Sequence, residues 1–330
     1  MKDGSREQVN HSMTLPGVMG TASAHPAARA RHDVFNGAVK WFVDPDSNAA
    51  RQVAEWRDTR PADAAVMAKL ARQSQADWFV GGPVQVREAV HSRVEQIQRQ
   101  HALPVLVAYN VPGRDCSGFS TGGANTAAEY ITWINRFAEG IGRHKAAVIL
   151  EPDSLALTEC LSSDQLDERY TLIRYAVRRL EAQPQVAVYL DGGHSAWQPA
   201  AEQAARLRRA GVERAHGFFL NVSNFQFTAD LIAYGHEVSD LIGVRGGTHF
   251  VIDTSRNGLG PWDATVPDNW CNPPGRALGH PATVRTGDPL VDAFLWIKRP
   301  GESDGTCRGG PPAGQWWPEY ALGLTQRSNL

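Results

Sequence analysis

Short apolar runs alternate with amphipathic stretches along the chain from about residue 34 onward. The apolar runs have the length and residue types of strands; they lie at residues 39–43, 77–80, 105–109, 147–150, 186–190, 217–221, 249–252 and 293–297. The stretches between them have helical spacing; they lie at 62–73, 84–101, 126–143, 164–182, 199–210 and 228–234. This alternation, without an internal repeat, predicts a parallel sheet wrapped by helices.

Charge and motif content exclude several classes of function. The 33 Lys and Arg residues nearly balance the 35 Asp and Glu residues, for a formal net charge of −2, so the chain lacks a basic footprint for nucleic acid or an anionic membrane. No stretch approaches the ~20 apolar residues of a membrane helix. A nucleophile elbow, a phosphate-binding loop, a dinucleotide fingerprint and metal-ligand spacing are absent from the sequence. We therefore expect no cofactor, no metal, no nucleic acid and no membrane as partners.

The cysteines are sparse, even in number and free of a C-x-x-C pair; they are Cys116, Cys160, Cys271 and Cys307. This set fits two disulfides in an oxidising compartment, and it equally fits four isolated thiols in a cytosolic enzyme. The first 33 residues hold few structure signals and lack the apolar core of a signal peptide. We interpret residues 1–33 as a flexible N-terminal segment or leader remnant, and 34–330 as a single domain.

Aspartates follow five of the predicted strands; they are Asp115, Asp153, Asp191, Asp253 and Asp304. Any one of them alone could cap a helix or start a turn. Parallel strands, however, bring their carboxyl ends to one edge, and crowded carboxylates raise the pKa of at least one member. Such a set, with Trp, His and Lys beside it, is typical of glycosidic bond hydrolysis, in which one carboxylic acid protonates the leaving oxygen and one carboxylate activates water or attacks.

Six sequence blocks occur in a fixed order over about residues 41–320. They are YNVPGRDC at 109–116, ILEPDSL at 149–155, LDGGHSAW at 190–197, VIDTSRNG at 251–258, WC at 270–271 and WIKRPGESDG at 296–305. Together they resemble glycoside hydrolase family 6, a family of cellulases, and are most similar to actinobacterial endo-β-1,4-glucanase catalytic domains. The resemblance implies that residues 34–330 form one catalytic domain, a distorted, TIM-like (β/α) barrel of about seven parallel strands with the active cleft at their C-terminal ends.

The resemblance also implies roles for four aspartates and a tyrosine. Asp153 matches the general acid, and Asp115 matches the neighbouring aspartate that keeps this acid protonated. Asp304 matches the proposed catalytic base, a role disputed in the family because the attacking water can instead lose its proton through a second water and a loop serine. Asp191 matches an aspartate that contributes to sugar binding and local electrostatics, and Tyr109 matches the tyrosine that crowds the sugar ring at subsite −1. The family inverts the anomeric carbon, so the acid and base should lie about 6.5–9.5 Å apart.

Further matching residues are expected to hold the glucan. Lys298 and Glu302 match residues that bind hydroxyl groups at subsite −2, the second sugar on the non-reducing side of the cleaved bond. Ser117 and Ser120 are the candidates for the relay serine. The stacking platforms and the other expected substrate-binding residues are Trp78, Trp197, Trp270, Asn221, His194 and Ser120. We expect His194 to serve as a hydrogen-bond partner rather than as a catalyst.

The family pattern pairs Cys116 with Cys160 and Cys271 with Cys307, and it implies a secreted enzyme, although no signal peptide is visible in the sequence. Gly192 stands where the pattern has alanine, and we expect a more flexible turn there.

Two further expectations concern buried side chains. The tryptophans at 56, 133 and 296 fall within helix or strand patterns, so we expect them in the core. Arg256 and Asp253 are expected to brace one another as a buried pair.

Three functions follow from this reading. The first is an inverting endo-β-1,4-glucanase, because segments 253–270 and 304–316 are too compact to roof the cleft. The second is a cellobiohydrolase that acts from chain ends, and the third is a glucan-binding protein without turnover. In each case the partners are cellulose and cello-oligosaccharides, and we expect a monomer.

Overall fold

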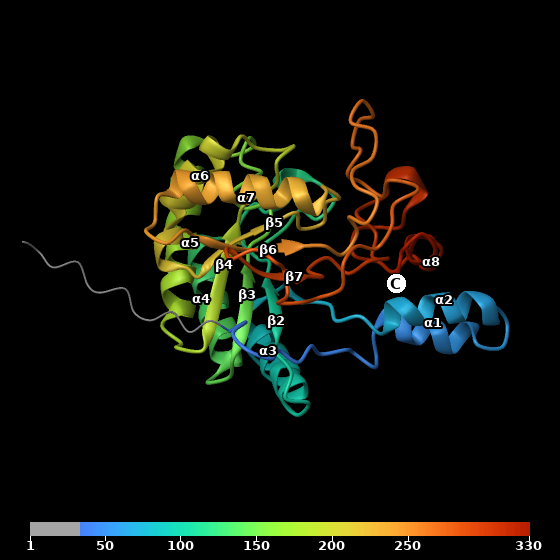
Figure 1. Cartoon of the computed structure of the whole chain (residues 1–330). Coiled ribbons are helices and arrows are strands. Elements are labelled where there is room, and N and C mark those ends of the chain that lie inside the picture. The colour runs from blue at the N-terminus through green and yellow to red at the C-terminus, as the bar shows by residue number, and fades with distance from the viewer. Residues whose placement is uncertain (1–33) are drawn as a thin grey trace, which may run out of the picture. The chain divides into compact units, whose positions relative to one another are not determined.

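The computed structural model describes residues 34–330, so the interpretation of residues 1–33 lies outside the described part. Seven parallel strands form one curled sheet in which the strand order follows the chain (Figure 1). They are β1 (Asp77–Phe79), β2 (Val105–Ala108), β3 (Ala146–Leu150), β4 (Val186–Asp191), β5 (Gly217–Leu220), β6 (His249–Asp253) and β7 (Val291–Leu295). The expected distorted barrel of about seven parallel strands is confirmed.

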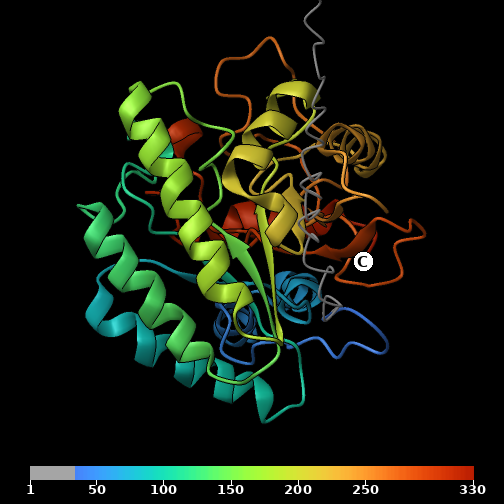
Figure 2. The same cartoon turned by 90° about the vertical axis from the view of Figure 1, so that its left-hand side faces the viewer.

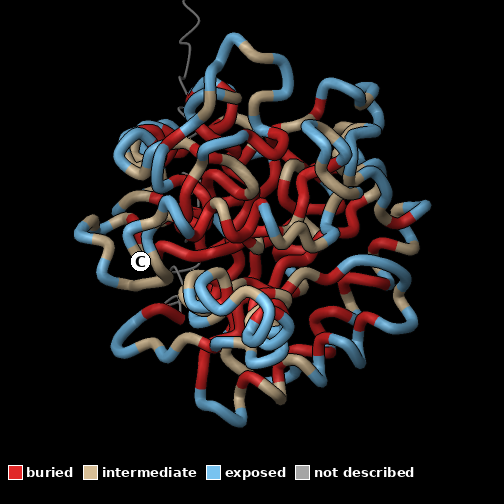
Figure 3. The backbone as a smooth tube through the Cα atoms, turned by 90° about the vertical axis from the view of Figure 1, so that its right-hand side faces the viewer, coloured by how far each residue is buried: buried red, intermediate tan, exposed pale blue. Residues whose placement is uncertain are grey.

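Both faces of the sheet are buried, which explains why the strands read as unbroken apolar runs. Successive residues of a strand point to opposite faces. In β3, Val148 and Leu150 belong to the apolar cluster shared with the outer helices, whereas Ala147 and Ile149 belong to a second cluster formed by the other face. Figure 3 shows the buried strands at the centre and the exposed segments around them. The strand ends are therefore held by packing from both sides.

Five helices cover the outer face of the sheet (Figure 2). They are α3 (Pro83–Gln98), α4 (Ala127–Ile141), α5 (Ser163–Glu181), α6 (Ala200–Ala210) and α7 (Thr228–Ile242). All five were predicted, although α7 continues to Ile242 instead of ending at 234. A capping box starts α5, because the Ser162 side chain accepts from the Gln165 N–H while the Gln165 side chain accepts from the Ser162 N–H. No helix within residues 34–330 is long and apolar enough to span a bilayer.

A second group of helices lies beside the sheet and consists of α1 (Asn48–Trp56), α2 (Pro61–Ala71) and α8 (Pro318–Gln326) (Figure 1). They share an apolar cluster that includes Trp56, Met67 and Tyr320. Only α2 was predicted, because α1 and α8 have only nine residues each, too short for a clear periodic signal. Trp56 is buried as expected, and so are the tryptophans at 133 and 296.

Residues 39–43 do not form the expected strand, and that prediction is wrong. Trp41 makes one isolated bridge, to Leu103 just before β2. Beyond this point β1 occupies the same edge of β2, with Asp77 opposite Leu106. A turn that brings the N–H of Ser47 to the carbonyl of residue 44 then leads directly into α1. The segment therefore has no free strand edge to pair with.

The edge strands β1 and β7 meet at a seam that side chains join. The indole Nε1 of Trp78 donates to the carbonyl of Ile297 at 2.8 Å. The Asp77 carboxylate accepts from Arg93 of α3 and from Arg299, which follows β7, each at 2.8 Å. The Asp77 side chain is only 8% exposed. One poorly hydrated carboxylate thus connects α3, β1 and the segment after β7.

Replacing this carboxylate should destabilise the fold. Asp77→Ala leaves two guanidinium groups without their partner, and we expect the free energy of unfolding to fall by about 2 kcal/mol, less than for a fully buried pair because both arginines keep some hydration. Urea unfolding measures this loss. The control is Asp167→Ala, which breaks an exposed ion pair with Arg209 and should cost less than about 1 kcal/mol. Equal losses in the two variants would contradict the role given to Asp77.

Candidate active site

Four of the predicted aspartates gather at one edge of the sheet. Asp115 follows β2, Asp153 follows β3, Asp191 ends β4 and Asp304 follows β7. Because the strands are parallel and β2, β3 and β4 are neighbours, their carboxyl ends lie side by side. The charges that act on Asp153 are those of Asp191, Asp115 and Lys298. The structure therefore brings together the residues that the sequence placed after separate strands.

Asp153 lies in a tight loop directly after β3. Both Glu151 and Asp153 have left-handed backbone conformations, with φ of 53° and 68°, which are uncommon for residues other than glycine and concentrate at functional sites. The hydroxyl of Tyr109 donates to Oδ2 of Asp153 at 3.1 Å. Trp78 packs edge-on against Tyr109, with 5.3 Å between ring centroids. This contact places an aromatic pair directly beside the Asp153 carboxyl group.

The surroundings of Asp153 favour its protonated form. Burial, together with the carboxylates of Asp191 and Asp115, raises the pKa of Asp153 to about 8. The Tyr109 hydrogen bond and the Lys298 charge oppose it but do not outweigh it. Asp153 nevertheless keeps partial solvent exposure. It can therefore hold a proton at neutral pH and still present that proton to a ligand.

The Asp115 loop follows β2 and has an unusual backbone. Asp115, Cys116 and Ser117 are consecutive left-handed residues, with φ of 57°, 42° and 69°. The Asp115 carboxylate accepts from the Ser120 N–H at 2.5 Å, and burial raises the pKa of Asp115. The Cys116–Cys160 disulfide ties this loop to the segment after the Asp153 loop, in the pairing that the family pattern implied. Of the two candidate relay serines, Ser117 is exposed and Ser120 is half-buried.

Asp191 is buried and acts on the backbone of the Asp153 loop. Its carboxylate accepts from the N–H groups of Leu155 at 3.0 Å, Ala156 at 2.8 Å and Gly193 at 3.1 Å. Burial raises the pKa of Asp191, and these backbone donors oppose the rise. Asp191 is 2% exposed. The structure thus places it behind the loop that it holds, where its charge reaches Asp153.

The glycine after Asp191 is explained by packing. A Cβ atom at Gly192 would lie 2.7 Å from the Phe219 carbonyl oxygen and 2.8 Å from the Phe218 ring. The Gly192 N–H donates to that same carbonyl at 2.9 Å. The missing Cβ at Gly192 therefore allows a close approach of the β4 end to β5, which a methyl group would obstruct.

Asp304 is buried between two cations. Nη1 of Arg256 lies 2.8 Å from Oδ2, and Nζ of Lys298 lies 3.3 Å from Oδ1. The Asn272 N–H donates to Oδ2 at 3.0 Å. Burial raises the pKa of Asp304, but Arg256 and Lys298 outweigh it and hold that pKa below its usual range. Asp304 therefore remains ionised at pH values where Asp153 is protonated.

The expected pair between Arg256 and Asp253 is wrong. Asp253 accepts instead from backbone N–H groups, including those of Ser255 at 2.9 Å and Lys298 at 2.9 Å. Through these bonds Asp253 holds the segment after β7 in place. The fully buried Arg256 forms its ion pair with Asp304 instead.

A disulfide and an asparagine hold the Asp304 loop. Cys271 pairs with Cys307, as the family pattern implied. The Asn272 side chain accepts from the Asp304 N–H at 2.8 Å and donates to the Gly305 carbonyl at 2.8 Å. These contacts fix the backbone on both sides of the carboxylate, so its orientation does not depend on the ion pairs alone.

The three expected stacking tryptophans differ in exposure. Trp270 is 40% exposed, with Phe119 at 6.3 Å between ring centroids, whereas Trp78 and Trp197 are half-buried. Lys298 is buried beside Asp304, and Glu302 keeps intermediate exposure. The expected glucan contacts are therefore spread over several loops at this edge.

Two other expected binding residues lie deeper in the protein. His194 is buried, which lowers its pKa to about 4 and leaves the ring neutral, and it packs against Trp197. Asn221 is 1% exposed: its Nδ2 donates to the Asp253 carbonyl at 2.8 Å and its Oδ1 accepts from the Gln226 N–H at 3.0 Å. Both side chains support the loops at the edge of the sheet from below.

Sequence reasoning missed two residues of this region. Glu151 is fully buried, and its Oε2 accepts from the N–H groups of Asn110 at 2.7 Å and Val111 at 2.9 Å. Its position two residues before Asp153 was the sequence signal that could have identified it.

The second residue is Phe119, which is 45% exposed. It lies so close to Gly305 that a Cβ atom on Gly305 would be 2.3 Å from the Phe119 ring. Phe119 thereby joins the Asp115 loop to the Asp304 loop, and no sequence pattern marks it.

The arrangement combines a protonated carboxyl group with an ionised one. Environments that push two carboxyl pKa values apart are the mark of an acid and base pair. Among residues 34–330, no group of three His, Cys, Asp or Glu residues is arranged to hold a metal ion. A protonated carboxyl group and an ionised one can transfer protons to and from a bound ligand.

Comparison with known proteins agrees with this arrangement. The sequence model of the family "Glycosyl hydrolases family 6" matches residues 36–328 of this chain. The chain is 42% identical to Endoglucanase 1 from Streptomyces halstedii, over 91% of this chain and 92% of that protein. It is 43% identical to Endoglucanase A from Cellulomonas fimi, over 87% of this chain and 61% of that longer protein.

Two solved structures are also similar. The endoglucanase Cel6 from Mycobacterium tuberculosis, in complex with a thio-linked cellobioside, has a TM-score of 0.83 and 46% identity, over 88% of this chain and 98% of that chain. The catalytic core of the cellobiohydrolase Cel6A from Chaetomium thermophilum has a TM-score of 0.78 and 28% identity, over 90% of this chain and 99% of that chain.

The raised pKa of Asp153 predicts a pH-dependent stability. The unfolded chain releases this proton near pH 4, whereas the folded protein keeps it to about pH 8, so stability falls as pH rises through this window. Asparagine does not titrate. Asp153→Asn should therefore gain stability over wild type between pH 5 and pH 7, by on the order of 2 kcal/mol after allowance for residual solvent exposure.

Urea unfolding at both pH values measures this difference. The control Asp167→Asn removes a carboxylate that is 71% exposed and should follow the wild type. A difference between Asp153→Asn and wild type that is the same at both pH values would contradict the raised pKa.

Proposed function

The chain belongs to the glycosyl hydrolases of family 6, and we propose that it is an endoglucanase that hydrolyses internal β-1,4-glucosidic bonds of cellulose-like glucans with inversion. The observation that carries this proposal is the opposite electrostatic setting of two carboxyl groups. Asp153 lies near other carboxylates with a raised pKa, and Asp304 lies between two cations with a lowered pKa.

In the proposed reaction, Asp153 donates its proton to the glycosidic oxygen as the bond to the anomeric carbon breaks. Asp115 and Asp191 keep that proton on Asp153 in the free enzyme, and their charges stabilise the oxocarbenium-like transition state. Tyr109 crowds the ring at subsite −1 and favours its distortion. A water attacks from the opposite face of the sugar, which inverts the anomeric configuration.

The proton of the attacking water has two routes in this proposal. It passes to Asp304 directly, or it passes through a second water and a serine of the Asp115 loop, where Ser117 and Ser120 lie, and is released to solvent water. The ion pair with Arg256 weakens Asp304 as a base, which supports the second route. Asp304 then acts mainly as a fixed negative charge opposite the developing positive charge.

Short loops support the endo mode of action. Segment 304–316 folds back on itself, because the Ser303 N–H donates to the Gln315 carbonyl at 2.8 Å and the Gly314 N–H to the Ser303 carbonyl at 2.9 Å. In this proposal the cleft is open, and Trp78, Trp197 and Trp270 act as sugar platforms. The proposal further includes a single catalytic domain at 34–330 that works outside the cytoplasm, as two disulfides favour.

The proposed acid can be tested by the leaving group. Asp153→Asn should lower kcat on carboxymethyl cellulose by at least about 100-fold, because proton donation typically contributes 10²–10⁴-fold. Cleavage of an aryl cellobioside with a strongly acidic phenol should fall less, since that leaving group needs little protonation. Asp167→Asn serves as the matched surface control. Equal losses on both substrates would count against Asp153 as the acid.

The endo mode can be tested by comparing viscosity with reducing ends on carboxymethyl cellulose. Internal cutting predicts a fast fall in viscosity while few reducing ends appear, and Asp153→Asn should abolish it. Reducing ends without a fall in viscosity would identify an exo-acting cellobiohydrolase. Glucan binding without any new reducing ends would identify a binding protein.

A further inference from the structure

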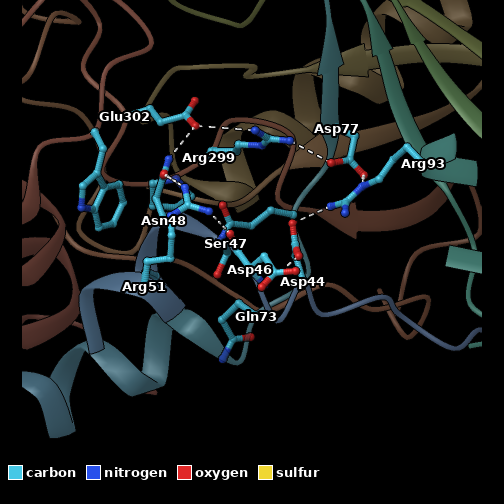
Figure 4. A pocket seen from close by; sticks show the side chains of 14 residues that line it. Asp44, Asp46, Ser47, Asn48, Arg51, Gln73, Asp77, Arg93, Arg299 and Glu302 are labelled. Atoms are coloured by element: carbon cyan, nitrogen blue, oxygen red, sulfur yellow. Dashed lines mark hydrogen bonds and ion pairs between the residues drawn. The ribbon is translucent and has the colours of Figure 1, made fainter. Parts of the chain in front are cut away.

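A polar cavity of about 210 Å³ lies at the seam between β1 and β7 (Figure 4). One side is formed by residues 44–51, where the chain turns into α1, and another by residues 73–77, which lead into β1. Arg299, Glu302 and Trp316, from segments after β7, complete the lining. The volume is below the ~300–1,000 Å³ of sites for drug-sized ligands. The cavity therefore suits a single small ring.

The charges around the cavity neutralise one another. Asp77 accepts from both Arg93 and Arg299, and Arg93 also binds Asp44 at 2.7 Å. Figure 4 shows these side chains as one connected row along the cavity. Because each charge in this row already faces an opposite one, the row offers no net attraction for a free anion or cation. The occupant that fits is neutral and rich in hydrogen-bonding groups.

The remaining lining matches the chemistry of a sugar. The side chains of Asn48, Arg51, Gln73 and Gln75 carry amide and guanidinium groups that can bond to hydroxyl groups. Trp316 adds an aromatic surface, and its indole Nε1 is oriented by Gln52, to which it donates at 3.0 Å. Hydrogen-bonding side chains next to an indole ring suit a pyranose, which has polar edges and apolar faces.

The cavity adjoins the proposed −2 subsite. Glu302 lines the cavity and is the residue expected to bind hydroxyl groups at −2; its Oε1 accepts from Asn48 Nδ2 at 3.3 Å. Arg299, which also lines the cavity, lies 3.7 Å from Oε1 of Glu302. One lining residue thus belongs to the expected −2 side, and two others contact it directly.

We infer that this cavity is a −3 subsite, which binds the glucosyl unit beyond −2 on the non-reducing side of the cleaved bond. The inference rests on the proposed function, because it extends the same glucan path. A subsite beyond −2 helps an enzyme to hold the middle of a chain and to release products longer than cellobiose. Arg51 is the clearest probe of this subsite, since it is exposed and its guanidinium donates to Asn48 and to the backbone carbonyl of Asp46, both close to it in sequence.

Cellohexaose labelled at its reducing end tests the inference. A filled −3 subsite favours cleavage into two trisaccharides, whereas an enzyme that ends at −2 favours a disaccharide and a tetrasaccharide. Arg51→Ala and Gln75→Ala should each lower the ratio of trisaccharide to disaccharide cleavage by about 3- to 10-fold, the effect of one lost hydrogen bond to the sugar. Both should hydrolyse cellotetraose at the wild-type rate, because cleavage at its centre does not use −3.

The matched control is Arg136→Ala, which removes an exposed arginine on α4 and should leave the product ratio unchanged. An unchanged ratio in both cavity variants, with cellotetraose still cleaved, would overturn the −3 subsite and leave the proposed function standing. A wild-type enzyme that fails to cleave cellotetraose and cellohexaose would instead overturn the proposed function. Should one cavity variant lose cellotetraose cleavage through misfolding, the other decides the result.

Discussion

The site depends on the bonds between the buried Asp191 carboxylate and the backbone of the Asp153 loop. Asp191 accepts from the N–H groups of Leu155 and Ala156, on the far side of Asp153 from β3. At the near side, buried Glu151 holds the backbone of the neighbouring β2 loop. A loop with two left-handed non-glycine residues is strained, and it persists because Asp191 binds its backbone at one end while the Glu151 side chain anchors its other end to the β2 loop. The same charge that fixes the loop then raises the pKa of the residue in it.

The enzyme uses one residue type in two electrical settings. Asp153 has carboxylates as its charged neighbours, so burial and repulsion both favour its neutral form. Asp304 is more deeply buried but faces Arg256 and Lys298, so attraction exceeds the cost of burial. Neither pKa follows from the aspartate itself. Each follows from which loops the sheet brings together, and the two disulfides restrain the loops that carry Asp115 and Asp304.

The strands could be predicted from the sequence because a sheet buried on both faces leaves unbroken apolar runs. The four aspartates could be placed at one edge of the sheet because the carboxyl ends of parallel strands lie together. Residues 39–43 have the same apolar signal, yet their only available edge was already taken by β1. The Arg256 pairing failed for a similar reason: Asp253 and Asp304 are both near, and backbone N–H groups that no pattern reveals had satisfied Asp253. Local patterns thus predict elements and their order, whereas competition for partners is decided only in three dimensions.

The missing strand also explains why polar residues collect where the sheet ends. Within residues 34–330, seven strands and a single bridge from Trp41 leave the outer side of β1 without an eighth strand to cover it. At this edge Nε of Arg299 donates to the Ala76 carbonyl at 2.9 Å, and ion pairs run from Asp44 through Arg93 and Asp77 to Arg299. The cavity lies beside this row of side chains. An incomplete barrel therefore gains a hydrophilic cavity at its seam, next to the loop that carries Asp304. Such a cavity can extend the binding path of a neutral glucan without disturbing the charges that act on the glycosidic bond.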